Sequence, residues 1–350
     1  MGSVTIYHVA KAARVSPSTV SNVLNGRVDR MLPQTRRRVE HAMKRLDYRP
    51  NRTARRLRTG RVASIGLIVP SVANPFWGAF ARHIEAAALA VGYHVLLCNS
   101  ERDPERERSY VDELWAEGIR GIVLCTSLPS LAHLSDKLDD GLSLVAFDRT
   151  AQVGDPPQVV NISLDNAVGA QLATRHLLAL GHRRFAFVSG SLKSINRRDR
   201  LRGFSEALRS EDLDPEQAQI WSGGNLSPDA DLDAAGLGRA AATDLLAGDP
   251  QTRPTAIVAV NDMCALGICA GVRDAGLEVG RDVSVTGFDD IVLANLVYPA
   301  LTTIRQPLEA MAEAAFDHVR RRIEGSPLTG ESLLMRPELI VRQSTGPAPH

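Results

Sequence analysis

The sequence is short of the residue patterns that build metal centres and disulfide frameworks. Its four cysteines are Cys98, Cys125, Cys264 and Cys269, and none forms a CxxC pair or stands beside a cluster of histidines. Zinc sites and iron–sulfur clusters need such spacing. Cys98 and Cys125 fall in apolar runs, so we predict buried thiols in a reducing compartment, and no metal or cofactor.

Long apolar runs are missing too. No stretch is long enough to span a bilayer, and no signal peptide precedes Thr5. The sequence therefore predicts a cytoplasmic protein that makes no membrane contact.

The common catalytic motifs are absent. No GxxxxGKS, GxxxxGKT, HExxH or GxSxG string occurs, and His94, His176 and His182 are isolated. One GxGxxA string, at residues 236–241, lies in an alanine-rich helical run and does not follow a strand, so it lacks the context of a dinucleotide site. We expect no enzymatic activity, with a Rossmann-like enzyme as an open alternative.

Charge is distributed unevenly along the chain. Residues 1–61 carry a net charge of +12 and the remainder carries −11, although the total is only +1. A basic segment on an acidic body is typical of nucleic-acid binding, because Lys and Arg neutralise phosphates and release counterions. The alternative is a solvated basic helix face.

The basic segment opens with a pair of short helices. In residues 5–26, TIYHVAKAARVSPSTVSNVLNG, apolar residues recur at helical spacing on either side of a tight turn. Thr5 can cap the first helix, and Ser16 followed by Pro17 can begin the second. A third helix at 33–46 closes a small core. The polar face of the second helix, which suits contact with base edges in a major groove, carries Ser18, Thr19, Ser21 and Asn22.

From residue 62 on, apolar strands alternate with amphipathic helices in two runs, about 62–161 and 162–290. This alternation predicts an α/β fold with parallel sheets covered by helices on both faces. Ligands bind beyond the carboxyl ends of such strands, although an Asp there can equally be a helix cap. Arg200 opens a helix at such an end. The polar residues that directly follow predicted strands are Asn74, Asp148, Asp165, Asn261, Asp262 and Asp289.

The segment VAKAARVSPSTVSNVLNG resembles the helix-turn-helix of the LacI/GalR family of bacterial transcription regulators, and the likeness continues along the chain. It implies a helix-turn-helix domain at 1–48, a hinge helix at 49–61, a periplasmic-binding-protein-like core at 62–342 and a flexible tail at 343–350. Within the core it implies two doubly wound subdomains, at about 62–161 with 291–323 and at about 162–290 with 324–342.

Two residues depart from the family pattern. His8 stands where an acidic residue often completes a capping box with Thr5. Arg14 stands in the turn, where Gly or Asn would adopt a positive φ at lower cost. Neither change removes the motif.

The resemblance also implies how DNA is bound. In this family the hinge helix folds only on specific DNA and wedges a leucine into the minor groove. Leu57 matches that leucine, whereas a lone peptide of this length is not stably helical and could be a disordered linker. The implied DNA contacts are Thr5, Tyr7, Ser16, Pro17, Ser18, Thr19, Ser21, Asn22, Asn25, Asn51, Ala54, Arg55, Leu57 and Arg58.

The core resembles a periplasmic sugar-binding protein used as a sensor. Carboxylates, amides and an arginine around a cleft suit ring hydroxyls, which both donate and accept hydrogen bonds. Trp77 could lay its ring on a sugar face or belong to the helix core. The effector contacts that the resemblance implies are Phe76, Trp77, Asp148, Arg149, Ser194, Asn196, Arg200, Asn261 and Asp289.

Together these features predict a dimeric transcription repressor, nucleoid-associated when it binds. Its expected partners are palindromic double-stranded operator DNA, a small effector, expected to be a sugar, and a second copy of the chain. The C-terminal segment shows no heptad repeat, so we expect a dimer and not a tetramer. A nucleobase corepressor and a solute-binding transport protein remain alternatives, although the basic segment disfavours transport.

Overall fold

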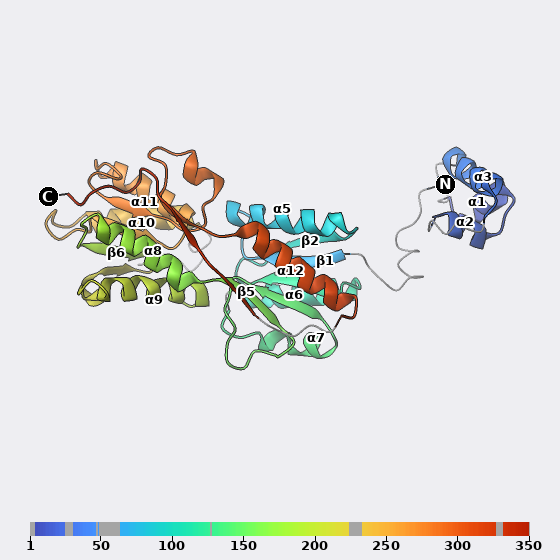
Figure 1. Cartoon of the computed structure of the whole chain (residues 1–350), viewed down its shortest axis with the longest axis horizontal. Coiled ribbons are helices and arrows are strands. Elements are labelled where there is room, and N and C mark those ends of the chain that lie inside the picture. Colours follow the sequence, from blue (N-terminus) through green and yellow to red (C-terminus); the bar gives the residue numbers. More distant parts are fainter. Residues whose placement is uncertain are drawn as a thin grey trace. The chain divides into compact units, whose positions relative to one another are not determined.

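The computed structural model describes residues 4–24, 31–46, 48, 64–126, 128–223, 233–326 and 332–349. It divides into two compact units, Met1–Val62 and Ala63–His350, which are described separately (Figure 1). Among the described residues, no helix has the length and apolar character needed to cross a membrane. None of the four cysteines forms a disulfide.

The first unit is a bundle of three helices, α1 (Ile6–Ala13), α2 (Pro17–Leu24) and α3 (Pro33–Arg45). Each contributes a buried apolar stripe to one core, as the helical spacing predicts. The buried residues are Val9, Ala10, Ala13, Val20, Val39 and Ala42.

The two unusual residues of this unit have clear structural roles. The backbone N–H of Thr5 donates to Nδ1 of His8 at 3.0 Å, so the imidazole accepts the hydrogen bond that a capping-box carboxylate would accept. Arg14 adopts the left-handed region at φ 53°, as its place in the turn predicts. Arg38 of α3 donates from Nη2 to the carbonyls of Ala13 at 2.6 Å and Arg14 at 2.9 Å, which braces that turn.

The second unit contains two parallel sheets. The first sheet has the strand order β11-β5-β4-β3-β1-β2. Gly66 and Gly121 on its neighbouring strands β1 and β3 face Leu114 of α6 and Val319 of α12, so these helices cover opposite faces. The elements are β1 (Ser64–Val69), β2 (His94–Asn99), β3 (Gly121–Cys125), β4 (Ser143–Phe147), β5 (Val160–Leu164), β11 (Leu333–Met335), α5 (Pro75–Ala90), α6 (Pro104–Ala116), α7 (Ser135–Asp139) and α12 (Leu308–Ile323).

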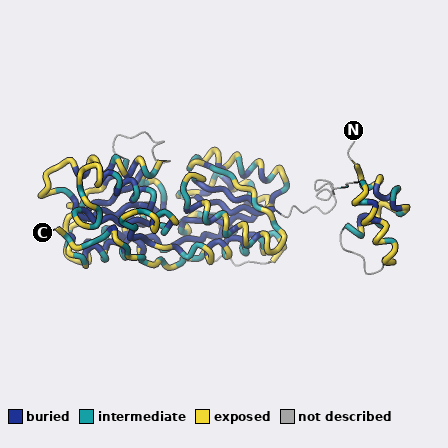
Figure 2. The backbone as a smooth tube through the Cα atoms, turned by 90° about the horizontal axis from the view of Figure 1, so that it is seen from above, coloured by how far each residue is buried: buried dark blue, intermediate teal, exposed yellow. Residues whose placement is uncertain are grey.

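The second sheet has the order β7-β6-β8-β9, with α8 and α9 on one face and α10 and α11 on the other (Figure 1). Its elements are β6 (Phe185–Val188), β7 (Gln219–Trp221), β8 (Ala256–Ala259), β9 (Ser284–Thr286), α8 (Asn166–Ala179), α9 (Ile195–Arg209), α10 (Ala234–Leu246) and α11 (Asp262–Asp274). Strands β10 (Thr303–Arg305) and β12 (Glu338–Ile340) form an antiparallel pair. Figure 2 shows the buried strands enclosed by helices whose outer faces are exposed.

Close helix packing explains the GxGxxA string. Its glycines lie within α10, and a Cβ on Gly238 would come within 2.0 Å of the carbonyl oxygen of Cys264 in α11. The glycine therefore lets two helices approach each other, and the string is a packing motif.

The structure corrects three boundaries. β5 was expected to begin the second subdomain, but it belongs to the first sheet, where it pairs with β4. β11 pairs with β5 in the same sheet, although residues 324–342 were assigned to the second subdomain. Residues 302–305 were assigned to the first subdomain. They bridge instead to the second sheet, through Thr302 to Thr286 and Arg305 to Asp289.

The expected flexible tail is also corrected. Ser344 is fully buried and donates to the carbonyl of Val285 at 2.6 Å, and the backbone N–H of Ala348 donates to Leu180 at 2.9 Å. Residues 343–349 pack against the second sheet because their backbone groups complete its hydrogen bonding.

Candidate functional site

The exposed face of α2 is the first candidate surface. The Ser16 hydroxyl accepts from the backbone N–H of Thr19 at 3.2 Å, which confirms the predicted cap, and it also lies 2.7 Å from the hydroxyl of Ser18. Pro17, Ser18 and Asn22 are exposed on the following turns. This helix thus presents short hydrogen-bonding side chains to solvent from a fixed N-terminus.

Not all the expected DNA contacts share this face. Thr5 and Tyr7 are exposed, and Tyr7 is 70 % exposed, but Ser21 is only 5 % exposed, so its expected place on the reading surface is corrected. Ser21 therefore belongs with Val20 to the buried side of α2. The expected contacts that lie outside the described residues are Asn25, Asn51, Ala54, Arg55, Leu57 and Arg58.

A cationic hollow lies on the same unit. It has a volume of about 290 Å³ and joins the α1–α2 turn to α3. Its charged and titratable lining residues are Arg14, Arg37, Arg38, His41 and Arg45. No carboxylate lines it, so this surface holds a local positive charge of the kind that attracts phosphate.

The second candidate is a cavity between the two sheets, at the carboxyl ends of their strands. Its volume is about 30 Å³, roughly the share of one water molecule in the liquid. Residues after β1, β2 and β4 meet residues after β6, β8 and β9 there. The lining residues are Asn74, Phe76, Trp77, Arg102, Asp148, Asn196, Arg197, Arg200, Val260, Asn261, Asp289 and Gln306.

Aromatic rings form the wall contributed by the first sheet. Phe76 and Trp77 stack edge-to-face with centroids 4.9 Å apart, and Trp77 makes a second edge contact with Phe147 at 6.3 Å. Asn74 fixes the start of α5 by accepting from the backbone N–H of Phe76 at 3.0 Å. Trp77 therefore belongs to the helix core and lines the cavity as well.

Asp148 connects the two halves of the cavity. Its Oδ2 accepts from Nδ2 of Asn196, in the first turn of α9, at 2.5 Å. Burial raises the pKa of Asp148, and the nearby guanidiniums of Arg200, Arg102 and Arg197 oppose that rise. A single carboxylate thus bonds across the cavity and balances several cations.

Arg200 is a buried cation held by neutral groups. Its Nε donates to Oδ1 of Asn166 at 2.8 Å, its Nη1 donates to the carbonyl of Val260 at 2.5 Å, and its guanidinium lies 3.6 Å from the ring centroid of Phe288. Burial lowers its pKa, while Asp289 and Asp148 oppose this. The amide, carbonyl and ring aim a cation into the cavity without neutralising it.

Asp289 completes the charged lining. Burial, together with repulsion from Asp262 and Asp148, holds its pKa well above the ordinary value, against the attraction of Arg200 and a 2.8 Å hydrogen bond from Nε2 of Gln306. Its expected alternative role as a helix cap is not seen; Asn261 is the cap of α11, accepting from the N–H of Cys264 at 2.9 Å.

Backbone strain concentrates at this cavity. Seven non-glycine residues of the described chain have positive φ, and Arg102, Asp148 and Asp289 line the cavity, with Glu101 and Asp290 adjacent. Such conformations cost on the order of 1 kcal/mol or more each and persist where a function requires them. The strain supports the cavity as a functional site.

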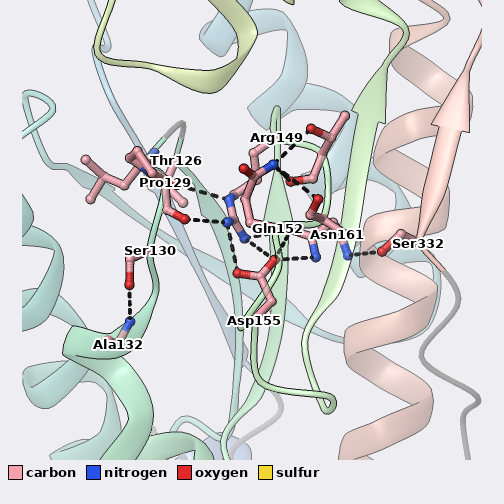
Figure 3. Close-up of polar contacts among 12 residues, drawn as sticks. Thr126, Pro129, Ser130, Ala132, Arg149, Gln152, Asp155, Asn161 and Ser332 are labelled. Carbon is pink, nitrogen blue, oxygen red and sulfur yellow. Dashed lines mark hydrogen bonds and ion pairs between the residues drawn. The ribbon is translucent and has the colours of Figure 1, made fainter.

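Two expected effector contacts lie elsewhere. Arg149 is fully buried behind the cavity, where Nη1 and Nη2 pair with the two carboxylate oxygens of Asp155 at 2.9 and 3.0 Å and Nη1 also donates to Asn161 (Figure 3). Ser194 does not line the cavity but donates to Oδ1 of Asn196 at 2.8 Å. Asp165 is a helix cap, accepting from Val168 at 3.0 Å.

Sequence reasoning missed four lining residues, Arg102, Arg197, Val260 and Gln306. Arg197 stands three residues before Arg200, a spacing that places both on one side of α9. The loop conformation of Arg102 and the path of Gln306 had no such signal. Among the described residues, no group of three or more His, Cys, Asp or Glu is placed to hold a metal ion.

Two family models match separate parts of the chain. A family model described as "Bacterial regulatory proteins, lacI family" matches residues 5–51, and one described as "Periplasmic binding protein-like domain" matches residues 174–345. The chain is 31% identical to the HTH-type transcriptional regulator DegA of Bacillus subtilis (strain 168), over 98% of each.

Two solved structures are similar over almost the whole chain. The Lac repressor dimer bound to operator and the anti-inducer ONPF matches with a TM-score of 0.86 and 29% identity, covering 99% of this chain and 100% of that one. The transcriptional regulator CelR in complex with cellobiose matches with a TM-score of 0.70 and 29% identity, covering 97% and 99%.

Proposed function

Because the chain belongs to the LacI family of bacterial regulatory proteins, we propose that a small effector bound between its two sheets controls how tightly it binds operator DNA. The protein is a DNA-binding transcription regulator and not an enzyme. The observation that carries the proposal is the cavity itself, where side chains from both sheets meet around Asp148 and Asn196.

The cavity chemistry supports a sugar as the effector. Carboxylates, amides and Arg200 can donate to and accept from ring hydroxyls, and Phe76 and Trp77 offer an aromatic wall. The similar regulator CelR has been solved with cellobiose.

A sugar cannot enter the cavity without a change in the protein. At about 30 Å³ the space holds roughly one water molecule. Binding therefore requires the lining groups to move, and we propose that the two sheets separate, so that an effector which favours the separated arrangement shifts its population. In this proposal, effector binding in the cavity changes how the two subdomains are arranged relative to each other.

A second copy of the chain is the proposed partner of an exposed sheet edge. β2 is the last strand of the first sheet, and Leu96 and Leu97 on it are 38 % and 49 % exposed, although parallel sheets are usually covered. Leu89 and Val91 at the end of α5 add to this apolar surface. A dimer that buries this apolar surface would carry two copies of the three-helix unit, which suits a palindromic operator.

For DNA reading we propose that Ser18 and Asn22 contact base edges from α2. Asn22 can form two hydrogen bonds with adenine but cannot make the guanine contact of an arginine. Leu57 as a minor-groove wedge stays a prediction from the sequence, and so does action in the cytoplasm on the nucleoid.

The test combines selection of DNA with a panel of metabolites. The purified full-length protein is used to select genomic fragments, and its affinity for the recovered sequence is measured with and without sugars and nucleobases. We expect a palindromic sequence, an affinity that falls steeply with salt, and a change caused by at least one sugar. No preference for any fragment over random competitor would contradict the proposal.

The Asn22 assignment has its own test. Asn22→Ala should relax the base preference at one position per half-site, at a cost of about 1–3 kcal/mol for the preferred base. A uniform loss across all sequences would show that Asn22 contacts only the backbone of the DNA.

A further inference from the structure

Two chain segments that connect the subdomains lie side by side. β10 and β12 form an antiparallel pair, and backbone bridges hold β10 to the second sheet. α12, which covers the first sheet, begins shortly after β10, and β11 of the first sheet ends shortly before β12 begins. We call residues 302–306 and 338–342 the crossing strands. A rearrangement of the two subdomains therefore acts on these strands.

One carboxylate holds both crossing strands. Oδ2 of Asp290 accepts from Nε of Arg305 at 2.7 Å, and its Oδ1 accepts from Nη2 of Arg342 at 2.6 Å. The side chains of Arg342 and Asp290 are only 13 % and 10 % exposed, so water screens their attraction less than it screens a surface pair. Nη1 of Arg342 also donates to the carbonyl of Leu301 at 2.8 Å. Asp290 thus ties the two strands to each other and to the end of β9.

The preceding residue, Asp289, belongs to the cavity. Its carboxylate lines the cavity and accepts from Nε2 of Gln306, at the end of one crossing strand, at 2.8 Å. Its backbone N–H donates to the carbonyl of Ile304 in the same strand at 2.8 Å. Asp289 therefore contacts both the ligand space and a crossing strand, and a single peptide bond joins it to Asp290.

The backbone of these two residues is strained. Asp289 has φ 122° and Asp290 has φ 52°, values that residues other than glycine adopt rarely and at a cost. This conformation sends consecutive side chains to different places, the first into the cavity and the second to Arg305 and Arg342. Because hydrogen bonds fix the segment from both sides, a displacement of Asp289 also moves Asp290.

We propose that Asp290 is a positioning residue that transmits effector binding from Asp289 to the crossing strands. The inference rests on the proposed function, in which an effector occupies the cavity. A ligand that bonds to Asp289 competes with Gln306 and shifts the segment, and the ion pairs with Arg305 and Arg342 pass the shift to both strands. The free and bound states then differ in the strength of these pairs, which gives the effector the differential free energy that a population shift requires.

The position of Asp290 distinguishes its role from that of a ligand contact. It is not among the residues that line the cavity, whereas Asp289 is. A substitution of Asp290 should therefore change how strongly ligand binding alters operator affinity, while the ligand's own affinity is retained. A residue that only stabilises the fold would change neither quantity in a variant that remains folded.

The test measures response and ligand affinity separately on the full-length protein. The probes are D-ribose, D-glucose, D-galactose, cellobiose, adenine and guanine at millimolar concentration, and the response ratio compares operator affinity with and without each. For a probe that changes the operator affinity of the wild-type protein, Asp290→Asn should bring this ratio below about twofold. Calorimetry without DNA should give a probe affinity within about threefold of the wild-type value.

Variants of a partner arginine and of an exposed pair complete the test. Arg342→Gln should lower the response ratio as Asp290→Asn does, and Arg342→Lys, which keeps a cation beside the carboxylate, should retain more of it. Arg281→Gln removes an exposed pair with Glu278 in the same subdomain and should leave the ratio unchanged. If Asp290→Asn does not fold, the two Arg342 variants carry the test.

The outcomes separate this proposal from the proposed function. A folded Asp290→Asn protein with the wild-type response ratio would overturn the role of Asp290. A loss of probe affinity that accounts for the whole loss of response would overturn it too, because it would place Asp290 at the ligand. If no probe changes the operator affinity of the wild-type protein, the proposed function itself is contradicted, and this proposal with it.

Discussion

Two buried arginines, Arg149 shortly after β4 and Arg200 in α9, are held in opposite ways. Arg149 is bound by both oxygens of Asp155, by Asn161 and by backbone carbonyls, so its charge is neutralised by the protein itself. Arg200 is bound by an amide, a carbonyl and an aromatic ring, which orient its charge but leave it formally uncompensated by direct ion pairing. We therefore propose that Arg149 has a structural role, whereas Arg200 is oriented to contact a ligand.

The largest expected effect is on the free energy of unfolding, and it tests the structural role of Arg149. Asp155→Asn leaves the guanidinium of Arg149 buried without its counter-charge, and the free energy of unfolding should fall by about 3–5 kcal/mol. Denaturant unfolding of the full-length protein measures it. Asp274→Asn is the matched control, because its pair with Arg239 is exposed and should contribute about 1 kcal/mol at most. Equal losses in both variants would remove the distinction.

A substitution in the cavity next to Arg200 should weaken effector binding and leave folding unchanged. Asp289→Ala removes a carboxylate that faces Arg200, and we expect effector affinity to fall about 100-fold, or about 2.7 kcal/mol, with operator affinity in the absence of effector retained. Titration of the operator complex with the effector measures the response. Retained induction would show that Asp289 does not contact the ligand.

The comparison between charged and neutral partners extends to a buried carboxylate whose hydrogen-bond donors are neutral. Asp262 accepts from the hydroxyl of Thr303 at 2.5 Å and the N–H of Ile291 at 2.8 Å. Burial, with repulsion from Asp290 and against the attraction of Arg342, raises its pKa to about 6. Since the pKa of Asp262 is higher in the folded protein than in the unfolded chain, protonation of this carboxyl group favours the folded state. The resulting stabilisation is complete below the unfolded pKa of about 4 and is lost as pH rises through 6.

The corresponding measurement is unfolding free energy against pH. Between about pH 4 and pH 7 this group should lower the stability by about 2 kcal/mol, and Asp262→Asn should remove that part of the slope. An unchanged slope in the variant would show that other groups cause the pH dependence.

The smallest effect concerns an arginine whose partners are backbone carbonyls. Arg38→Ala should destabilise the helical unit by about 1 kcal/mol, because the carbonyls of Ala13 and Arg14 lose their donor. Hydrogen exchange of the turn amides in the full-length protein measures it. Arg36→Ala, which removes only an exposed pair with Glu40, should change exchange less.

Much of this molecule was predictable because its signals are local. The helical stripes around Val9 and Val39, the cap at Ser16 and the strand ends that carry Asp148, Asn261 and Asp289 all follow from spacing within one element. Phe76 and Arg200 were expected to lie together and do line one cavity, because the ends of parallel strands meet at one edge.

The predictions that failed depend on loop conformations and on contacts between different elements, which spacing within one element does not show. Arg149 follows Asp148 directly, and only the position of Asp155 and Asn161 decides that it turns away from the cavity. The three-residue strand β11 joins the first sheet through β5, far from it in sequence. Arg102 enters the cavity through a strained loop, a conformation that no spacing rule predicts.

The hydrogen bond between Asp148 and Asn196 has a consequence for sensitivity. If the effector binds in this cavity, as we propose, it competes with the protein itself, because it has to displace this internal hydrogen bond before it forms its own. The dose at which the regulator responds therefore depends on the strength of that bond as well as on the ligand's intrinsic affinity, in proportion to the fraction of molecules in which it is broken. Ser194 donates to Asn196 without lining the cavity, so a substitution there is expected to retune the response threshold while leaving ligand preference intact.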